Sequence, residues 1–215
     1  LLFSALLIFG NLSAQDKAAL VNPIIGTNGM GHTFPGACVP FGLVQLSPDT
    51  DTIPHNVDGK YQPRAYEYCA GYQHKDSSIV GFSHTHFSGT GHSDLGDILI
   101  MPATGELKLN PGTATDPDGG YRSRFSHDTE VSRPGYYEVM LADYGVKAQL
   151  TATKRVGVHK YTFPKEAKNQ RSILDMIHGI YNYDGKVLWT NIRVENDTLV
   201  TGYRITNGWA RTNYT

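Results

Sequence analysis

The sequence predicts an all-β fold, an antiparallel β-sandwich. Several short segments between 137 and 205 alternate apolar with polar residues, and turn dipeptides such as Asp184-Gly185 and Asn196-Asp197 separate them. No amphipathic helical period persists for long enough to form a helix of ordinary length. Closely spaced strands without intervening helices favour antiparallel sheets over a parallel α/β sheet.

The elements follow from local patterns along the chain. From Asn22 to about Pro134, glycine, proline, histidine and short polar clusters predict loops and short strands. Residues 137–141 and 148–152 alternate on either side of Asp143-Tyr144-Gly145, which is typical of a β-hairpin.

Four more strands are expected after this hairpin. In the first, Val156 to Phe163, the inward-facing residues shift phase between Val158 and Tyr161, which predicts a β-bulge. The others are predicted at 172–177, 186–194 and 199–205. We expect the strand aromatics Tyr161, Phe163 and Trp189 to lie in the core.

Composition excludes some classes of protein. The 215 residues are 40% hydrophobic and 18% charged, as in an ordinary globular protein. Their formal net charge is −1 and they contain no run of lysine or arginine, so the basic footprint of a nucleic-acid-binding protein is missing. Two cysteines, Cys38 and Cys69, are too few for a disulfide framework, and whether they pair stays open.

The first and last residues predict that the protein is exported and that the chain is a fragment. Residues 1–14 are apolar and end in Leu12-Ser13-Ala14, which is typical of the remnant of a secretory signal peptide; a buried hydrophobic segment is the alternative. No later stretch is apolar enough to span a bilayer, so we expect a periplasmic or secreted protein. Residues 209–215 continue an alternating pattern without a closing turn, which predicts a fragment that stops within a strand.

The first candidate binding segment is glycine-rich and spans Asn22 to Gly42. Dense glycines allow close approach of the backbone to a ligand. The spacing of Gly26, Gly29 and Gly31 fits neither a dinucleotide loop nor a phosphate-binding loop. The alternative is a surface turn in which His32 only makes a hydrogen bond.

The second candidate segment runs from Gly81 to Asp97. If it is a strand, His84 and His86 point to one face and can share a metal or a substrate. A metal site of the cupin type needs an acidic ligand shortly after this pair, and only His92 or Asp94 is available to replace it.

Asp94 and Asp97 also suggest the carboxylate pair of a glycosidase. Three residues apart on one loop, they are better suited to capping that loop than to flanking a sugar. Aromatic side chains that can stack on sugar rings occur near both segments, namely Phe34, Tyr61, Tyr66, Tyr68, Tyr72 and Phe87.

Together the two segments resemble the N-terminal domain of glycoside hydrolase family 92, the calcium-dependent exo-α-mannosidases. The resemblance is carried, in the family's order, by Asn22-Pro23-Ile24-Ile25-Gly26-Thr27, Gly31-His32-Thr33-Phe34-Pro35-Gly36-Ala37, Val39-Pro40-Phe41-Gly42-Leu43-Val44-Gln45-Leu46-Ser47-Pro48-Asp49-Thr50, Ile79-Val80-Gly81-Phe82-Ser83-His84-Thr85-His86, Ser88-Gly89-Thr90-Gly91, Gly96-Asp97-Ile98-Leu99, Gly202-Tyr203-Arg204 and Gly208-Trp209-Ala210. It covers nearly all of the chain after the leader.

The resemblance implies a galactose-mutarotase-like β-sandwich over residues 22–215, truncated at its C-terminal end, and a downstream (α/α) toroid domain absent from this chain. It implies an inverting α-mannosidase that removes terminal mannose from glycans, often α-1,2-linked, with its active site between the two domains. The general acid, the catalytic base and most ligands of Ca²⁺ are expected in the toroid, so no catalytic residue or metal ligand is assigned here.

The resemblance also implies that three loops, 29–34, 66–72 and 82–91, line the sugar pocket. The expected substrate-binding residues are His32, Phe34, Tyr68, His84, His86, Ser88 and Gly89. Position 68 is Tyr where members similar to the α-1,2-specific enzymes carry Trp, which leaves the linkage open. Expected partners are a mannose-containing glycan and the chain's own toroid domain. The alternative function is a stand-alone carbohydrate-binding β-sandwich.

Overall fold

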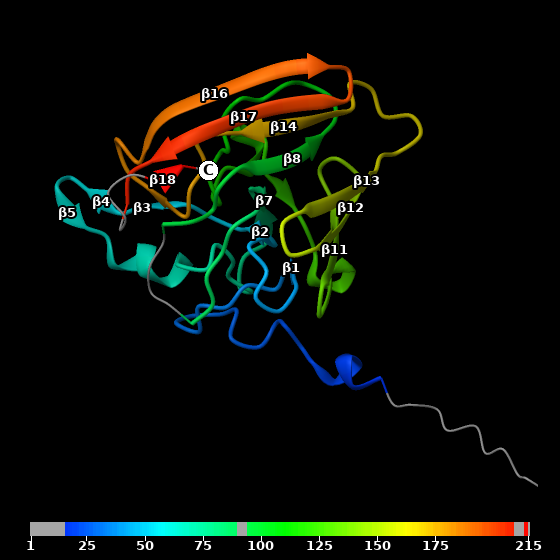
Figure 1. The fold of residues 1–215 in the computed structure, drawn as a ribbon, viewed down its shortest axis with the longest axis horizontal. Coiled ribbons are helices and arrows are strands. Elements are labelled where there is room, and N and C mark those ends of the chain that lie inside the picture. Colours follow the sequence, from blue (N-terminus) through cyan, green and yellow to red (C-terminus); the bar gives the residue numbers. More distant parts are fainter. Residues whose placement is uncertain (1–15, 90–93, 209–212, 215) are drawn as a thin grey trace, which may run out of the picture.

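A computed structural model describes residues 16–89, 94–208 and 213–214 (Figure 1). The predicted leader, residues 1–14, and the segment 209–212 lie outside the described residues, as does His92. Helical structure in the described ranges is confined to four short 3-10 turns: η1 (Lys17–Leu20), η2 (Pro63–Tyr68), η3 (Pro117–Gly119) and η4 (His127–Thr129). None of these turns is long and apolar enough to cross a membrane.

Two antiparallel sheets form a sandwich, as the sequence predicts. The first has the order β1 (Ala37–Cys38), β2 (Gln45–Asp49), β7 (Gly81–Ser83), β8 (Leu99–Ala103) and β14 (Arg171–Asp175). The second has the order β10 (Val131–Arg133), β11 (Tyr136–Leu141), β12 (Val146–Ala152) and β13 (Gly157–Thr162).

Smaller sheets complete the fold. A three-stranded sheet contains β16 (Val187–Asn196), β17 (Leu199–Thr206) and β18 (Asn213–Tyr214). Two antiparallel pairs join β4 (Asn56–Val57) to β5 (Lys60–Tyr61) and β6 (Ser78–Ile79) to β9 (Ser123–Arg124). A parallel pair joins β3 (Ile53–Pro54) to β15 (Tyr181–Asn182).

The core lies between the two larger sheets. Every second residue of β11 and β12 is buried, which is the alternation that predicted this hairpin. Their inward side chains pack on those of β2, β7 and β8; the fully buried members include Leu46, Phe82, Leu99, Met101, Tyr137, Val139, Leu141, Val146 and Leu150. Tyr161 and Phe163 pack against this cluster, so their predicted core position is confirmed.

The predicted bulge in β13 is wrong. β13 pairs with β12 in continuous register from Gly157 to Thr162. Val158 lies on the outer face and is 45% exposed, while His159 takes the inward position next to it. The apparent phase shift therefore arises because a polar residue faces inward and an apolar one faces outward. Register shifts do occur between β16 and β17.

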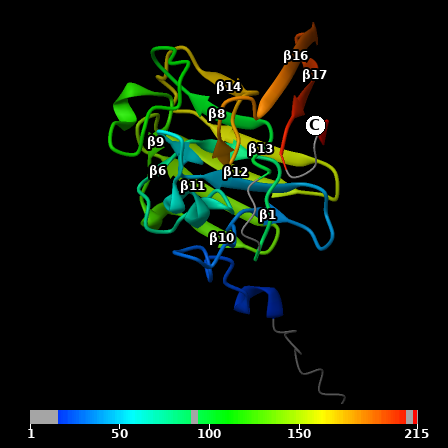
Figure 2. The same ribbon diagram turned by 90° about the vertical axis from the view of Figure 1, so that its left-hand side faces the viewer.

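The predicted core position of Trp189 is also wrong, because this side chain is 60% exposed. β16 and β17 form a long hairpin that projects beyond the two larger sheets (Figure 2). Its exposed apolar side chains are Leu188, Trp189, Ile192, Val194, Leu199, Val200 and Tyr203. The alternating pattern around Trp189 is therefore that of a strand, but this strand does not lie over the core.

The two cysteines do not pair in the structure: no disulfide joins Cys38 to Cys69.

Candidate functional site

The three loops expected to line a pocket come together in the structure. The backbone N–H of Gly89 donates a hydrogen bond to the carbonyl of His32 (2.7 Å). The Gln73 side chain joins the loop at 29–34 to the loop at 66–73: its Oε1 accepts from Gly29 N–H (2.8 Å), and its Nε2 donates to the carbonyls of Gly29 (2.9 Å) and Glu67. Segments far apart in sequence therefore form one surface, which we call the loop cluster (29–34, 66–73 and 84–89).

His32 stands out within the loop cluster. Its backbone has φ 51°, a left-handed conformation that is uncommon for residues other than glycine. The ring packs edge-on against Tyr66, with centroids 4.8 Å apart, and the residue is 7% exposed. Its Nε2 is buried without a hydrogen-bond partner among the described residues. A buried polar atom of this kind requires an explanation, and a ligand is one.

Beneath the loop cluster, Asp49 at the end of β2 lies between two histidines. His86 Nε2 is 2.8 Å from Asp49 Oδ1, and His178 Nε2 is 2.6 Å from Asp49 Oδ2. His86 Nδ1 lies 2.7 Å from the carbonyl of Gln45, so both nitrogens of this ring face acceptors and the pattern requires a hydrogen on each. The ring also packs against Phe34, with centroids 5.3 Å apart.

The charge state of Asp49 follows from this geometry. Burial by itself raises the pKa of the carboxyl group. The charge of His86 and the hydrogen bonds from both histidines outweigh burial and hold the pKa well below its usual range. Asp49 is therefore an ionised carboxylate fixed inside the protein, and it anchors the segment that carries His86.

A second buried ion pair extends this network. Arg204 Nη2 lies 2.7 Å from Asp97 Oδ1, and Arg204 Nη1 donates to the carbonyl of His178 (2.6 Å). The other oxygen of Asp97 accepts from the hydroxyl of Thr85 (2.7 Å). Asp97 thus holds the loop that precedes His86, as expected from its predicted capping role. Burial, followed by the positive charge of Arg204, lowers the pKa of Lys186 in the same region to about 8.

His84 belongs to a different hydrogen-bond chain. Its Nδ1 faces the carbonyl of Ile98 (2.7 Å) and must donate, so its Nε2 accepts from His159 Nε2 (3.1 Å). His159 Nδ1 then accepts from the hydroxyl of Tyr161 (2.6 Å). Burial lowers the pKa of both histidines, that of His159 to about 3 with a further contribution from His84. Because His84 faces His159 and His86 faces Asp49, the two rings serve separate networks.

The remaining predicted residues differ in exposure. Ser88 and Gly89 are exposed on the loop cluster. Tyr68 is 1% exposed, packs with Ile53, Ala65 and Ile180, and donates to Asp76 Oδ1 (3.1 Å). Burial, followed by the charge of Asp76, raises the pKa of its phenol. In the described chain Tyr68 therefore lies under the loop surface.

A glycine is required beside Asp49, which leads to a prediction. Gly71 has φ 79°, and a Cβ placed there would lie 2.0 Å from Asp49 Oδ1. Gly105 has nearly the same conformation, φ 77°, with nothing within 4 Å of its Cβ position. We expect Gly105→Ala to lower the free energy of unfolding by about 1–2 kcal/mol, because of the backbone conformation alone. Gly71→Ala should cost about 1–3 kcal/mol more, because the methyl group displaces Asp49.

Urea unfolding of both alanine variants checks this prediction. The difference between their free energies of unfolding isolates the contact with Asp49, since both variants bear the same cost of the backbone conformation. Equal midpoints for the two variants would show that the Asp49 carboxylate does not need the space above Gly71.

A separate hollow of about 440 Å³ lies between β14 and β16. Its lining includes Met176, Ile177, Thr190 and Ile192, and none of the predicted pocket residues. His178 also borders it and reaches Asp49 from that side. The hollow therefore lies behind the buried network rather than at the loop cluster.

Sequence reasoning missed several members of this network. Asp49 and Arg204 occur within the quoted motifs, but no pattern assigned them a role. His159 and His178 lie on distant segments and reach His84 and Asp49 only through the fold. Isolated histidines carry no spacing signal, so only the tertiary contacts identify them.

The chain matches a family model and a curated protein. The family model described as glycosyl hydrolase family 92 N-terminal domain matches residues 20–215. Among curated proteins, an uncharacterized secreted glycosidase of Arthroderma benhamiae is 29% identical over 171 residues, which is 75% of this chain and 19% of that protein.

Solved structures extend the comparison. A family GH92 α-mannosidase of Bacteroides thetaiotaomicron, solved in complex with mannoimidazole, is 44% identical with a TM-score of 0.81, covering 92% of this chain and 24% of that one. A GH92 inverting mannosidase of the same organism is 26% identical with a TM-score of 0.60, covering 90% and 24%. The chain thus spans about a quarter of the length of these solved relatives.

Proposed function

Because the chain belongs to glycoside hydrolase family 92 and matches its N-terminal domain over residues 20–215, we propose that it forms one wall of the sugar pocket of an α-mannosidase. The enzyme would hydrolyse terminal α-mannosidic bonds of glycans. The observation that carries the proposal is the buried His32 Nε2 without a partner, at the point where the three loops meet. A sugar hydroxyl supplies the partner that this nitrogen lacks.

The chemistry of the loop cluster suits a sugar. Imidazole nitrogens, hydroxyls and backbone amides exchange hydrogen bonds with sugar hydroxyls, while an aromatic ring covers the apolar face of the sugar. Phe34, Ser88 and Gly89 supply such groups at the surface of the loops, and the buried ring of His32 lies directly beneath. His84, His86 and Tyr68 make hydrogen bonds within the protein, so we assign them to the layer that fixes the loops in place.

The hydrolytic groups are proposed to lie outside this chain. Inverting glycosidases need one carboxylic acid to protonate the leaving oxygen and one carboxylate to activate water on the opposite face of the sugar. Here Asp49 is held by two buried histidines, Asp97 pairs with the buried Arg204, and Glu67 in the loop cluster pairs with Lys75 (2.5 Å). These three carboxylates therefore serve the fold, and the chain contributes recognition of the sugar rather than proton transfer.

Calcium, which the family resemblance implies, fits this loop cluster poorly. Ca²⁺ takes six to eight oxygen ligands, mostly carboxylates and carbonyls. Glu67 is the one acidic residue in the loop cluster, and it is paired with Lys75. We therefore propose that any calcium ion is held mainly by groups outside the described residues, and we derive no step through it.

The exposed face of the β16–β17 hairpin supports a role within a larger enzyme. Its apolar residues include Ile192 and Val194, which are 47% and 72% exposed, and large exposed apolar surfaces mark sites of contact. Since the solved relatives are about four times as long as the matched region, we propose that the remainder of the enzyme, its toroid domain, covers this face. The secreted relative supports export to the periplasm or medium.

The test of this function replaces the unpartnered histidine. His32→Ala should weaken binding of mannoimidazole to the enzyme by up to about tenfold, the worth of one net hydrogen bond. Affinity is measured by calorimetry, with folding checked by circular dichroism. His55→Ala is the matched control, since His55 packs on Tyr61 and Tyr183 rather than on the loop cluster. Unchanged affinity in His32→Ala would remove His32 from the pocket.

A further inference from the structure

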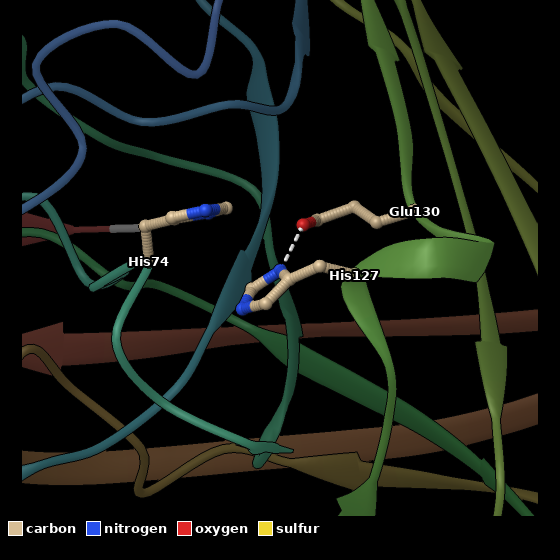
Figure 3. A group of neighbouring side chains, drawn as sticks. All are labelled: His74, His127 and Glu130. Atoms are coloured by element: carbon tan, nitrogen blue, oxygen red, sulfur yellow. Dashed lines mark hydrogen bonds and ion pairs between the residues drawn. The ribbon is translucent and has the colours of Figure 1, made fainter.

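A cluster of two histidines and a glutamate lies apart from the loop cluster. His74 follows η2 in the chain, His127 begins η4, and Glu130 directly follows η4 (Figure 3). One potential ligand atom from each residue lies within 4.8 Å of the other two. The two imidazole rings face each other with centroids 4.0 Å apart. Residues more than fifty positions apart in sequence thus place their metal-binding atoms together.

Glu130 is held as a ligand would be. Its side chain is only 3% exposed, and its oxygens accept from the hydroxyls of Tyr72 (2.9 Å) and Tyr137 (2.7 Å). Both phenols donate to the carboxylate and fix its position. Partners of this kind orient the carboxylates of metal sites.

His127 and His74 face this fixed carboxylate. His127 Nδ1 lies 2.6 Å from Glu130 Oε2 and donates a hydrogen bond to it. The Tyr72 hydroxyl that contacts Glu130 also lies 3.4 Å from His74 Nδ1. Among the described residues, no Lys or Arg forms an ion pair with Glu130. The nitrogen that faces the buried carboxylate is Nδ1 of His127.

We propose that His74, His127 and Glu130 form a binding site for a divalent transition-metal ion such as Zn²⁺. Two imidazoles and one carboxylate are a ligand set of this class of ion, and water completes the coordination. The ion takes the place of the proton between His127 and Glu130. Ligands of tetrahedral zinc lie about 3.3 Å apart, so the side chains must draw together; His127, 36% exposed, has room to turn.

A bound ion would clamp two parts of the fold. Gln73, next to His74, holds the loop that carries Gly29, whereas η4 packs on β11. The ion would therefore link the base of the loop cluster to the second sheet. The proposal rests on the cluster alone and is independent of the glycan that the enzyme cleaves.

The experiment is a calorimetric titration of the metal-free protein with Zn²⁺, alongside its thermal unfolding. We expect one equivalent to bind and the melting temperature to rise. His74→Ala and His127→Ala should each lower the affinity by more than the roughly 10–100-fold lost with outer partners of a metal ligand. Both histidines are at least partly exposed, so these variants should fold. Glu130→Gln serves as a third variant.

Two controls make the result specific. His159→Ala removes one member of the other close histidine pair, with His84, and should leave zinc binding unchanged. Ca²⁺ should not compete, because a hard cation prefers oxygen ligands. Loss of binding in His159→Ala would overturn the proposal, as would zinc affinity that is equal in the wild type and His127→Ala, or no zinc binding by the wild type.

Discussion

Asp49→Asn should lower the free energy of unfolding by about 3–5 kcal/mol, the typical cost of removing one charge from a buried pair. The amide has nearly the same shape as the carboxylate, but its NH₂ group must face either His86 or His178. Both of these rings present Nε2 to Asp49, at 2.8 and 2.6 Å. At one of the two histidines, the amide NH₂ then faces the Nε2–H of the ring, so two donors meet where a donor and an acceptor made a hydrogen bond. Equilibrium unfolding in urea measures the loss.

The control for this prediction is Asp118→Asn. Asp118 also has a basic partner, Arg124, but the side chain of Asp118 is 76% exposed. Ion pairs in solvent contribute little, so this variant should unfold close to the wild type. If Asp49→Asn were as stable as Asp118→Asn, the buried network would not be holding the segment with His86.

The same residue predicts a dependence on pH. The folded protein holds the pKa of Asp49 below that of the unfolded chain, which is about 3.9. The stabilisation that ionised Asp49 provides is therefore complete above the pKa of the unfolded chain. It is lost as the pH falls through the pKa that Asp49 has in the folded protein. The difference in unfolding free energy between wild type and Asp49→Asn should narrow as pH falls from about 5 towards 2. A gap that stays constant over this range would contradict the assignment of an ionised Asp49.

Arg204→Met should also lower the free energy of unfolding by about 3–5 kcal/mol, which is the second large effect that we expect. Arg204 is fully buried, and the substitution leaves Asp97 as a buried charge without its partner at 2.7 Å. It also removes the hydrogen bond that Arg204 donates to the carbonyl of His178. Unfolding in urea, with the midpoint and slope compared with those of the wild type, measures the change.

A double variant separates charge from packing. Asp97→Asn combined with Arg204→Met removes both charges and should be about 1–3 kcal/mol more stable than additivity of the single variants predicts. Arg193→Met on β16 is the matched control, because its ion pair with Glu195 is largely exposed and should matter little. Strict additivity in the double variant would show that Arg204 acts through packing alone.

The sequence by itself determined the class of fold and the loops of the candidate site. Alternation along β11 and β12 requires one buried face, so the hairpin could be predicted from residue order alone. The motifs from Asn22 to Gly42 and Gly81 to Asp97 likewise carried the family resemblance, and the family match confirms it. Local patterns suffice where neighbouring residues share one environment.

Tertiary structure decided the rest. Whether Trp189 is buried depends on what lies over β16, and the inward place of His159 depends on His84, which is 75 residues away. Asp49, His178 and Arg204 meet from three distant segments, and His74 and Glu130 meet from two. Contacts of this kind have no period or fixed spacing, because they arise when strands pack and not from neighbours along the chain.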